Sequence, residues 1–249
     1  MWVELGQQSL EASVIGYKAY NLQLMSGSLK LKVPPSYLLD HPFVINTRTD
    51  AIINIYSTLE IVDCLNKIMR RSSIMKYPLI IRSSTNIEDQ VERSCAGLFK
   101  SIKNITEESQ LLSTINSIIE PVTFDTFEKY GIPIDTYKIN ILAQPFLQCK
   151  TTLIVFTHDT IFKSSNYLVE FYENGNVVSL ISLDKSGIIV KTHSEIKKNY
   201  LYNLIDNKLL KKLSDILSTI ITLFNSHQNV ELGIFNKELI VFQSRPITI

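Results

Sequence analysis

The sequence predicts an α+β protein in which amphipathic helices and apolar strands follow one another along the chain. Residues 204–224 place apolar side chains on one face of a helix, the clearest helical pattern present. Residues 166–183 form two strand-like halves around Asn174-Gly175, a strong turn signal. At 249 residues the chain can bury a sizeable core, as one large domain or as two lobes.

The other helices and strands are predicted from the same two patterns, an apolar face at helical spacing and short apolar runs. The segment 13–27 is predicted to open with a turn at Gly16 and to continue as a helix. Further helices are predicted over 57–71 and over 108–130, the latter with a break at Pro121. Strands are predicted over 79–81, 98–102, 138–147, 152–157, 230–235 and 239–245. No internal repeat, low-complexity tract or Gly/Ser linker interrupts them.

Composition excludes several classes of protein. The net charge of +1 gives no electrostatic reason to expect a nucleic acid or a membrane surface as partner. No apolar run approaches the roughly 20 residues of a membrane span, and the N-terminus does not resemble a signal peptide. The three widely spaced cysteines fit reduced thiols, so we expect a cytoplasmic protein. The glycine patterns of P-loop and dinucleotide-binding proteins do not occur, so a nucleotide site must be of another kind.

A polar segment follows the apolar run at 79–81. Arg82-Ser83-Ser84-Thr85 combines a cation with three hydroxyls, and Glu88-Asp89 and the small residues 94–97 come next. A guanidinium can bind two phosphate oxygens at once, and hydroxyls at a strand end add donors. The segment is therefore a candidate polyphosphate site. The alternative is a polar loop with one surface arginine.

Lys18 lies in the first turn of the helix predicted over 13–27. Free N–H groups and the helix dipole favour an anion at this end of a helix. Lys18 is therefore a candidate phosphate ligand. The alternative is a solvated surface lysine, which is the commoner situation for this residue type.

The last two strands bring polar side chains together. If residues 236–238 form the loop, Phe235 lies opposite Leu239 and Glu231 lies opposite Gln243. Gln243 and Arg245 then share a face with Glu231 across from them. Glu231 and Gln243 would supply oxygen ligands to Mg²⁺, and Arg245 would bind phosphate oxygens. The alternative is the polar outer face of an ordinary hairpin.

Three blocks of sequence together resemble one enzyme family. They are Gly16 to Leu22 followed by Val33-Pro34-Pro35, the segment 81–97, and 230–232 with 242–248. In this order they resemble the nucleotide-binding domain of phosphoenolpyruvate synthase and pyruvate phosphate dikinase. The resemblance implies an ATP-grasp-like α+β fold with lobes at 1–143 and 144–249 and ATP in the cleft between them.

The resemblance also implies a role for single residues. The residues that match the family's phosphate ligands are Lys18, Arg82, Ser83 and Arg245. Of these, Arg82 and Arg245 would act in catalysis. The family's Mg²⁺ ligands are matched by Glu231 and Gln243. Gln144-Pro145-Phe146 resembles the hinge that binds adenine, although its Pro and Phe depart from the family pattern. Ile154 stands where the family has a glycine before Phe156-Thr157.

The implied activity is that of an ATP-dependent phosphotransferase. With Mg²⁺, ATP would phosphorylate a histidine on a separate domain, in cis or in trans, or an acceptor substrate. The competing function is a non-catalytic nucleotide-binding or regulatory module, and a third is a degenerate scaffold that binds no nucleotide. The sequence does not identify the acceptor, whether AMP or ADP is released, or whether the chain is a fragment or a stand-alone protein.

Overall fold

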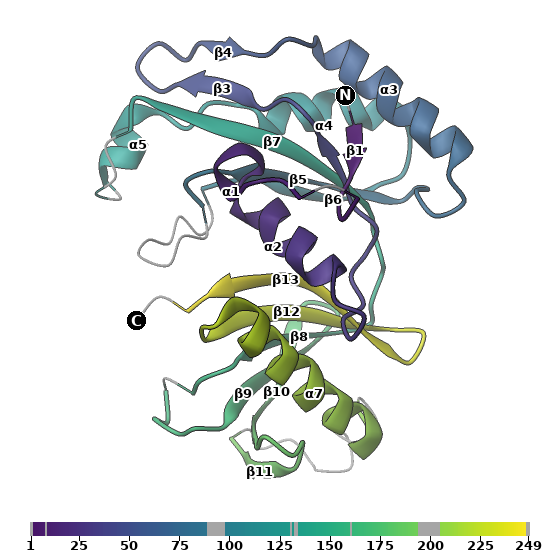
Figure 1. Ribbon diagram of the computed structural model, residues 1–249, viewed down its shortest axis with the longest axis vertical. Coiled ribbons are helices and arrows are strands. Elements are labelled where there is room, and N and C mark those ends of the chain that lie inside the picture. Colours follow the sequence, from purple (N-terminus) through teal and green to yellow (C-terminus); the bar gives the residue numbers. More distant parts are fainter. Residues whose placement is uncertain are drawn as a thin grey trace. The chain divides into compact units, whose positions relative to one another are not determined.

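A computed structural model shows the architecture of the chain (Figure 1). It describes residues 2–7, 9–88, 98–129, 131, 134–159, 161–193 and 205–247. The chain forms two compact units. Unit 1 comprises Met1–Gln23 and Pro35–Leu147, and unit 2 comprises Leu24–Pro34 and Gln148–Ile249. Each unit contains an antiparallel sheet with helices, so the predicted α+β class is confirmed.

Unit 1 is built on a seven-stranded sheet around one long strand, β7. Its strands are β1 (Trp2–Glu4), β2 (Tyr37–Leu39), β3 (Phe43–Asn46), β4 (Ile52–Ile53), β5 (Leu79–Thr85), β6 (Ser101–Ile105) and β7 (Thr136–Pro145). Its helices are α1 (Ala12–Ile15), α2 (Tyr17–Ser26, whose last turn belongs to unit 2), α3 (Thr58–Arg71), α4 (Ser109–Ile118) and α5 (Phe124–Lys129). Along β7, β5 pairs on one edge, while β2 and β3 share the other.

The core of unit 1 lies between this sheet and helices α3 and α4, which cover one face of it (Figure 1). Alternate residues of β5 and β7 point into that core, among them Leu79, Ile81 and Ile141. Helix α3 begins at a capping box, because the Ser57 hydroxyl accepts from the Glu60 N–H while Glu60 accepts from the Ser57 N–H. The helix predicted over 57–71 is therefore confirmed.

Strand β5 is longer than predicted. The sequence indicated a strand that ends at Ile81, but pairing with β7 continues to Thr85. The polar residues Arg82 to Thr85 are all buried within the sheet. Buried polar groups can continue a strand when they have hydrogen-bond partners, as the Ser84 hydroxyl has in the Ile15 carbonyl.

Unit 2 is a six-stranded antiparallel sheet in the order β11-β10-β9-β8-β12-β13. Its elements are β8 (Thr151–Phe156), β9 (Tyr167–Glu173), β10 (Asn176–Leu183), β11 (Ile189–Thr192), α7 (Asn207–Phe224), β12 (Gln228–Phe235) and β13 (Glu238–Pro246). The apolar stripe of α7 is buried against one face, where the Tyr167 and Ser218 hydroxyls lie 3.1 Å apart. The hairpin predicted around Asn174-Gly175 is confirmed, with both residues at positive φ.

The hairpin of β12 and β13 corrects one detail of the predicted pairing and confirms another. Phe235 lies opposite Glu238, not Leu239, because the loop consists only of Asn236 and Lys237, both with left-handed backbone. A β-bulge between Glu231 and Leu232 then shifts the register by one residue. The shorter loop and the extra bulge residue offset one another, so Glu231 does lie opposite Gln243.

Within the described ranges, no helix is both long and apolar enough to cross a membrane.

Candidate functional site

In unit 1, Gly16 lies between helices α1 and α2 and makes a close contact with strand β5. Its φ is +79°, and a Cβ at this position would lie 2.5 Å from the Ser84 carbonyl carbon and Oγ. The Ser84 hydroxyl donates to the Ile15 carbonyl (2.8 Å) and accepts from the Ala19 N–H (2.9 Å), thereby satisfying groups at the break between α1 and α2. The first two sequence blocks therefore meet at one joint within unit 1.

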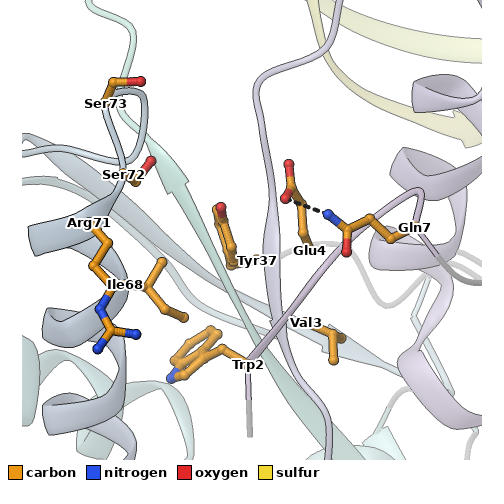
Figure 2. Close-up of a pocket in the computed structure, with 9 residues that line it drawn as sticks. All are labelled: Trp2, Val3, Glu4, Gln7, Tyr37, Ile68, Arg71, Ser72 and Ser73. Carbon is orange, nitrogen blue, oxygen red and sulfur yellow. Dashed lines mark hydrogen bonds between the residues drawn. The ribbon is translucent and has the colours of Figure 1, made fainter.

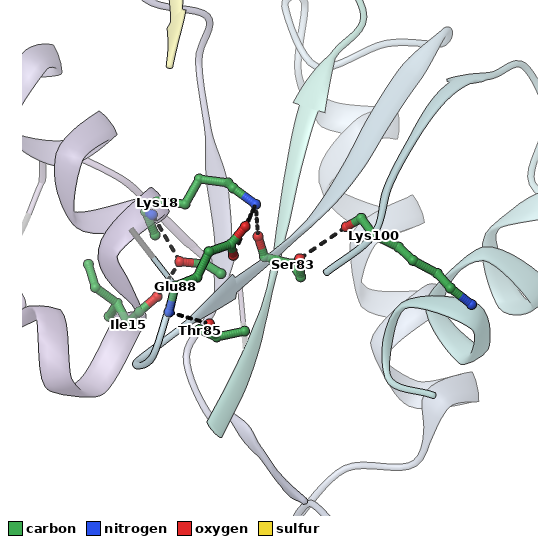
Figure 3. Close-up of polar contacts among 8 residues, drawn as sticks. Ile15, Lys18, Ser83, Thr85, Glu88 and Lys100 are labelled. Atoms are coloured by element: carbon green, nitrogen blue, oxygen red, sulfur yellow. Dashed lines mark hydrogen bonds and ion pairs between the residues drawn. The ribbon is translucent and has the colours of Figure 1, made fainter. Parts of the chain in front are cut away.

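Lys18 is buried beside this joint, with only 3% of its surface exposed. Its ammonium donates to the Ser83 carbonyl oxygen (2.9 Å) and to both carboxylate oxygens of Glu88 (3.0 and 3.2 Å), as Figure 3 shows. The alternative of a solvated surface lysine is therefore wrong. The predicted role in phosphate binding remains a prediction.

The hydroxyls of the same segment have internal partners. Ser83 Oγ donates to the Lys100 carbonyl (3.0 Å), and Thr85 Oγ1 accepts from the Glu88 N–H (3.0 Å) (Figure 3). In this arrangement they hold the segment together, whereas the sequence predicted them as phosphate donors. The binding role of Ser83 stays a prediction, and Asp89 and residues 94–97 lie outside the described residues.

Arg82 and Gln144 lie on the face of the unit 1 sheet opposite the core of α3 and α4. They occupy pairs of the β5–β7 ladder that are two residues apart and share this face, Arg82 with Leu142 and Ile80 with Gln144. Arg82 is buried, and the Gln144 amide donates to Ser36 Oγ (2.8 Å). At the end of β7, the Phe146 N–H donates to the Pro78 carbonyl (2.7 Å). That N–H is thus engaged within the unit, and the adenine contact predicted for Gln144 and Phe146 stays a prediction.

In unit 2, the face of the sheet that lies opposite α7 carries the third block. Glu231 pairs with Gln243, and Asn229 pairs with Arg245 in the next row. Directly opposite side chains have Cβ atoms about 5 Å apart, and diagonal ones about 7–8 Å. Within the described part of the chain, neither Glu231 nor Arg245 has an ion-pair partner. A carboxylate and a guanidinium that are neighbours but unpaired can both serve a ligand.

Asn229 belongs to this group, although our reading of the sequence missed it. Its side chain is 9% exposed, and its amide oxygen has no hydrogen-bond partner among the described residues. The available signal was the period of two along a strand, which places Asn229 on the same face as Glu231. A buried amide oxygen without a partner is costly, and a bound cation would satisfy it.

This donor set fits Mg²⁺ better than a transition metal. It offers one carboxylate and two amide oxygens, and Mg²⁺ sites combine one or two carboxylates with phosphate oxygens and water. Among the described residues, no group of three or more His, Cys, Asp or Glu side chains could hold a metal. A cation here would therefore need ligands beyond these three side chains, such as phosphate oxygens.

Comparison with known proteins gives matches at the level of structure only. The chain matches no protein-family model and no curated protein. It is similar to the D-alanine–D-alanine ligase from Helicobacter pylori, with TM-score 0.50, 16% identity, and 96% of this chain and 56% of the ligase covered. The chain has an ATP-grasp fold. It spans about half the length of that ligase.

A second ATP-grasp structure in the comparison is an ADP complex of N5-carboxyaminoimidazole ribonucleotide synthetase. It has TM-score 0.48 and 8% identity, and the match covers 95% of this chain and 46% of the synthetase. The ATP-grasp fold predicted from the sequence is thus confirmed by the match to the ligase. Likeness at these identities concerns the fold alone, so the roles of single residues in this chain rest on their own geometry.

Proposed function

We propose that this ATP-grasp chain is the ATP-binding part of a phosphotransferase of the phosphoenolpyruvate synthase and pyruvate phosphate dikinase type. It uses Mg-ATP to phosphorylate a histidine on a separate domain or an acceptor substrate, with 1–143 and 144–249 as its two lobes. The observation that carries the proposal is the unpaired Glu231 and Arg245 beside Gln243 on one sheet face. A module that bound only adenine would not need a carboxylate, an amide and a guanidinium in this arrangement.

Each residue has a distinct part in the proposal. Glu231 and Gln243 bind Mg²⁺, and Arg245 binds phosphate oxygens. Lys18 and Arg82 are the cationic residues of unit 1 that we assign to the phosphates, with Lys18 exchanging Glu88 for a phosphate oxygen. Phosphoryl transfer depends mainly on positioning and neutralisation of charge, so these groups suffice without a protein nucleophile. Mg²⁺ supplies the polarisation of the phosphoryl oxygens when it is bound.

Arg245→Ala is expected to weaken Mg-ATP binding by about 1.5–3 kcal/mol, which is the usual range for a hydrogen bond to a charged group. Adenosine lacks phosphates, so its affinity should stay the same. Isothermal calorimetry with both ligands measures this, with Mg-ATP dissociation constants expected between about micromolar and millimolar. Lys237→Ala is the matched control, because it removes a positive charge from the turn of the same hairpin. Equal losses for ATP and adenosine, or no binding of Mg-ATP by the parent chain, would contradict the proposal.

Glu231→Gln should raise the Mg²⁺ concentration needed for half-maximal ATP binding by about tenfold or more, because a charged ligand is replaced by a neutral one of equal size. The measurement is an Mg²⁺ titration at fixed ATP. The control is Glu170→Gln, since Glu170 lies in the same row of the sheet, two strands away across Ile154. An identical shift in both variants would mean that general charge on this face matters, not a specific metal site.

The non-catalytic module remains the second candidate function, in which Lys18, Arg82 and Arg245 bind nucleotide but no transfer follows. The contacts of Lys18 with Glu88 and of the Phe146 N–H with Pro78 favour it, because they hold these two groups away from a catalytic arrangement. Such a module would bind Mg-ATP without turnover. Phosphorus NMR of the chain with ATP and a candidate phosphohistidine domain distinguishes the two, because transfer releases AMP or ADP whereas a module leaves ATP intact.

A further inference from the structure

Unit 1 contains a pocket that none of the candidate nucleotide residues lines. It has a volume of about 550 Å³ and lies between strand β1, strand β2 and the C-terminal end of helix α3 (Figure 2). Sites for small molecules typically have volumes of about 300–1,000 Å³ and combine apolar walls with a few polar groups. This pocket has both features, because Trp2, Tyr37 and Ile68 line it together with Arg71 and Glu4.

The two charged residues come from opposite sides of the pocket. Figure 2 shows Arg71 on the side formed by α3, and Glu4 with Gln7 on the side formed by the N-terminal segment. Arg71 makes no ion pair within the described part of the chain, and the Glu4 carboxylate interacts there with neutral groups, the Gln7 amide (2.9 Å) and the Tyr37 phenol. The pocket therefore presents one cation and one anion that do not form an ion pair with each other.

The aromatic residues between them are held in place. The Trp2 indole donates to the Ile61 carbonyl (3.0 Å), and strand pairing sets Glu4 directly opposite Tyr37. Partial burial and the nearby negative charge of Glu4 both raise the pKa of Tyr37, which keeps its phenol neutral. An indole and a phenol at fixed positions provide a surface for an apolar or aromatic group of a ligand.

We propose that this pocket binds a small zwitterion with an apolar side chain, namely a free amino acid or a dipeptide. The ligand carboxylate pairs with the planar guanidinium of Arg71, its ammonium pairs with Glu4, and its side chain contacts Trp2 and Tyr37. A polyanion such as a nucleotide would bring negative charge towards Glu4, and a simple cation would bring positive charge towards Arg71. The proposal does not depend on ATP binding, since the two sets of residues are different.

The test uses the single tryptophan of the chain, because only one indole N–H signal arises in a nitrogen-15 NMR spectrum. L-phenylalanine added up to tens of millimolar should shift the Trp2 indole signal in a saturable way. Two analogues each lack one charge: N-acetyl-phenylalanine has no ammonium and phenylalaninamide has no carboxylate. Each should bind about tenfold more weakly or worse. Saturating Mg-ATP should leave the phenylalanine affinity unchanged.

Variants give an independent measurement. Arg71→Ala and Glu4→Gln should each lower the affinity for phenylalanine about tenfold, while Arg70→Ala should not change it. Arg70 is the matched control, because it is also exposed in the last turn of α3 but does not line the pocket. An indole signal that stays unchanged with phenylalanine, equal binding of the charge-deleted analogues, or a preference for AMP over phenylalanine would overturn the proposal.

Discussion

Gly16→Ala is expected to destabilise unit 1 by about 2–6 kcal/mol, for two additive reasons. Alanine at φ +79° takes up a backbone conformation that is open almost only to glycine, which costs about 1–3 kcal/mol. Its Cβ would also lie 2.5 Å from the backbone of Ser84 and 2.6 Å from the Thr85 nitrogen. Overpacking of that kind adds about 1–3 kcal/mol, because strand β5 cannot move without disturbing its pairing with β7.

Urea denaturation followed by tryptophan fluorescence measures this effect, since Trp2 lies in unit 1 and is the only tryptophan. Gly131→Ala is the matched control, because Gly131 also has positive φ (+68°) but no atom of the described residues lies within 4 Å of an added Cβ. The control should lose only about 1–2 kcal/mol from backbone strain. If the two variants lose equal amounts, the contact between Gly16 and Ser84 is not a tight joint.

Breaking the Lys18–Glu88 pair is the second change with a large expected effect. Both side chains are buried, at 3% and 8% exposed, so removal of one partner takes away the ion pair that balances the other buried charge. Lys18→Met and Glu88→Gln should therefore each destabilise unit 1 by about 3 kcal/mol or more. The double variant should lose less than the sum of the two, because either single variant already removes the ion pair.

The double-mutant cycle separates this pairing from a general loss of packing. Asp63→Asn provides the comparison within the same unit, because Asp63 forms an exposed ion pair with Lys67 one helical turn away on α3. Loss of that pair should change stability little, since exposed pairs contribute little in water. Strict additivity of Lys18→Met and Glu88→Gln would show that the two groups do not stabilise each other.

Local patterns in the sequence were enough to predict the long elements. The helix over 57–71, the apolar stripe of α7 and the Asn174-Gly175 turn depend on neighbouring residues, and all three appear in the structure. The four short strands β1, β3, β4 and β11 were missed. Strands of two to four residues carry too little periodicity to be recognised, and their pairing depends on longer partners such as β7 and β10.

The candidate site was predicted in part. The face shared by Glu231, Gln243 and Arg245 followed from the alternation of side chains, and the structure confirms that Glu231 pairs with Gln243. The predicted three-residue loop was wrong in a way that did not alter this pair. A bulge adds one residue to one strand and leaves no reliable mark in the sequence, so counting from the turn cannot detect it.

By itself, the sequence determined where the helices lie, where the chain turns and which residues share a strand face, because these depend on interactions over a few residues. Only the tertiary structure decided the surroundings of Lys18 and of the hydroxyls that follow Arg82. Glu88 is 70 positions from Lys18, and the partners of Ser84 are 65 and 69 positions away. Burial and hydrogen bonding at such separations depend on the packing of β5 against α2, because no local pattern encodes the partner of a buried polar group.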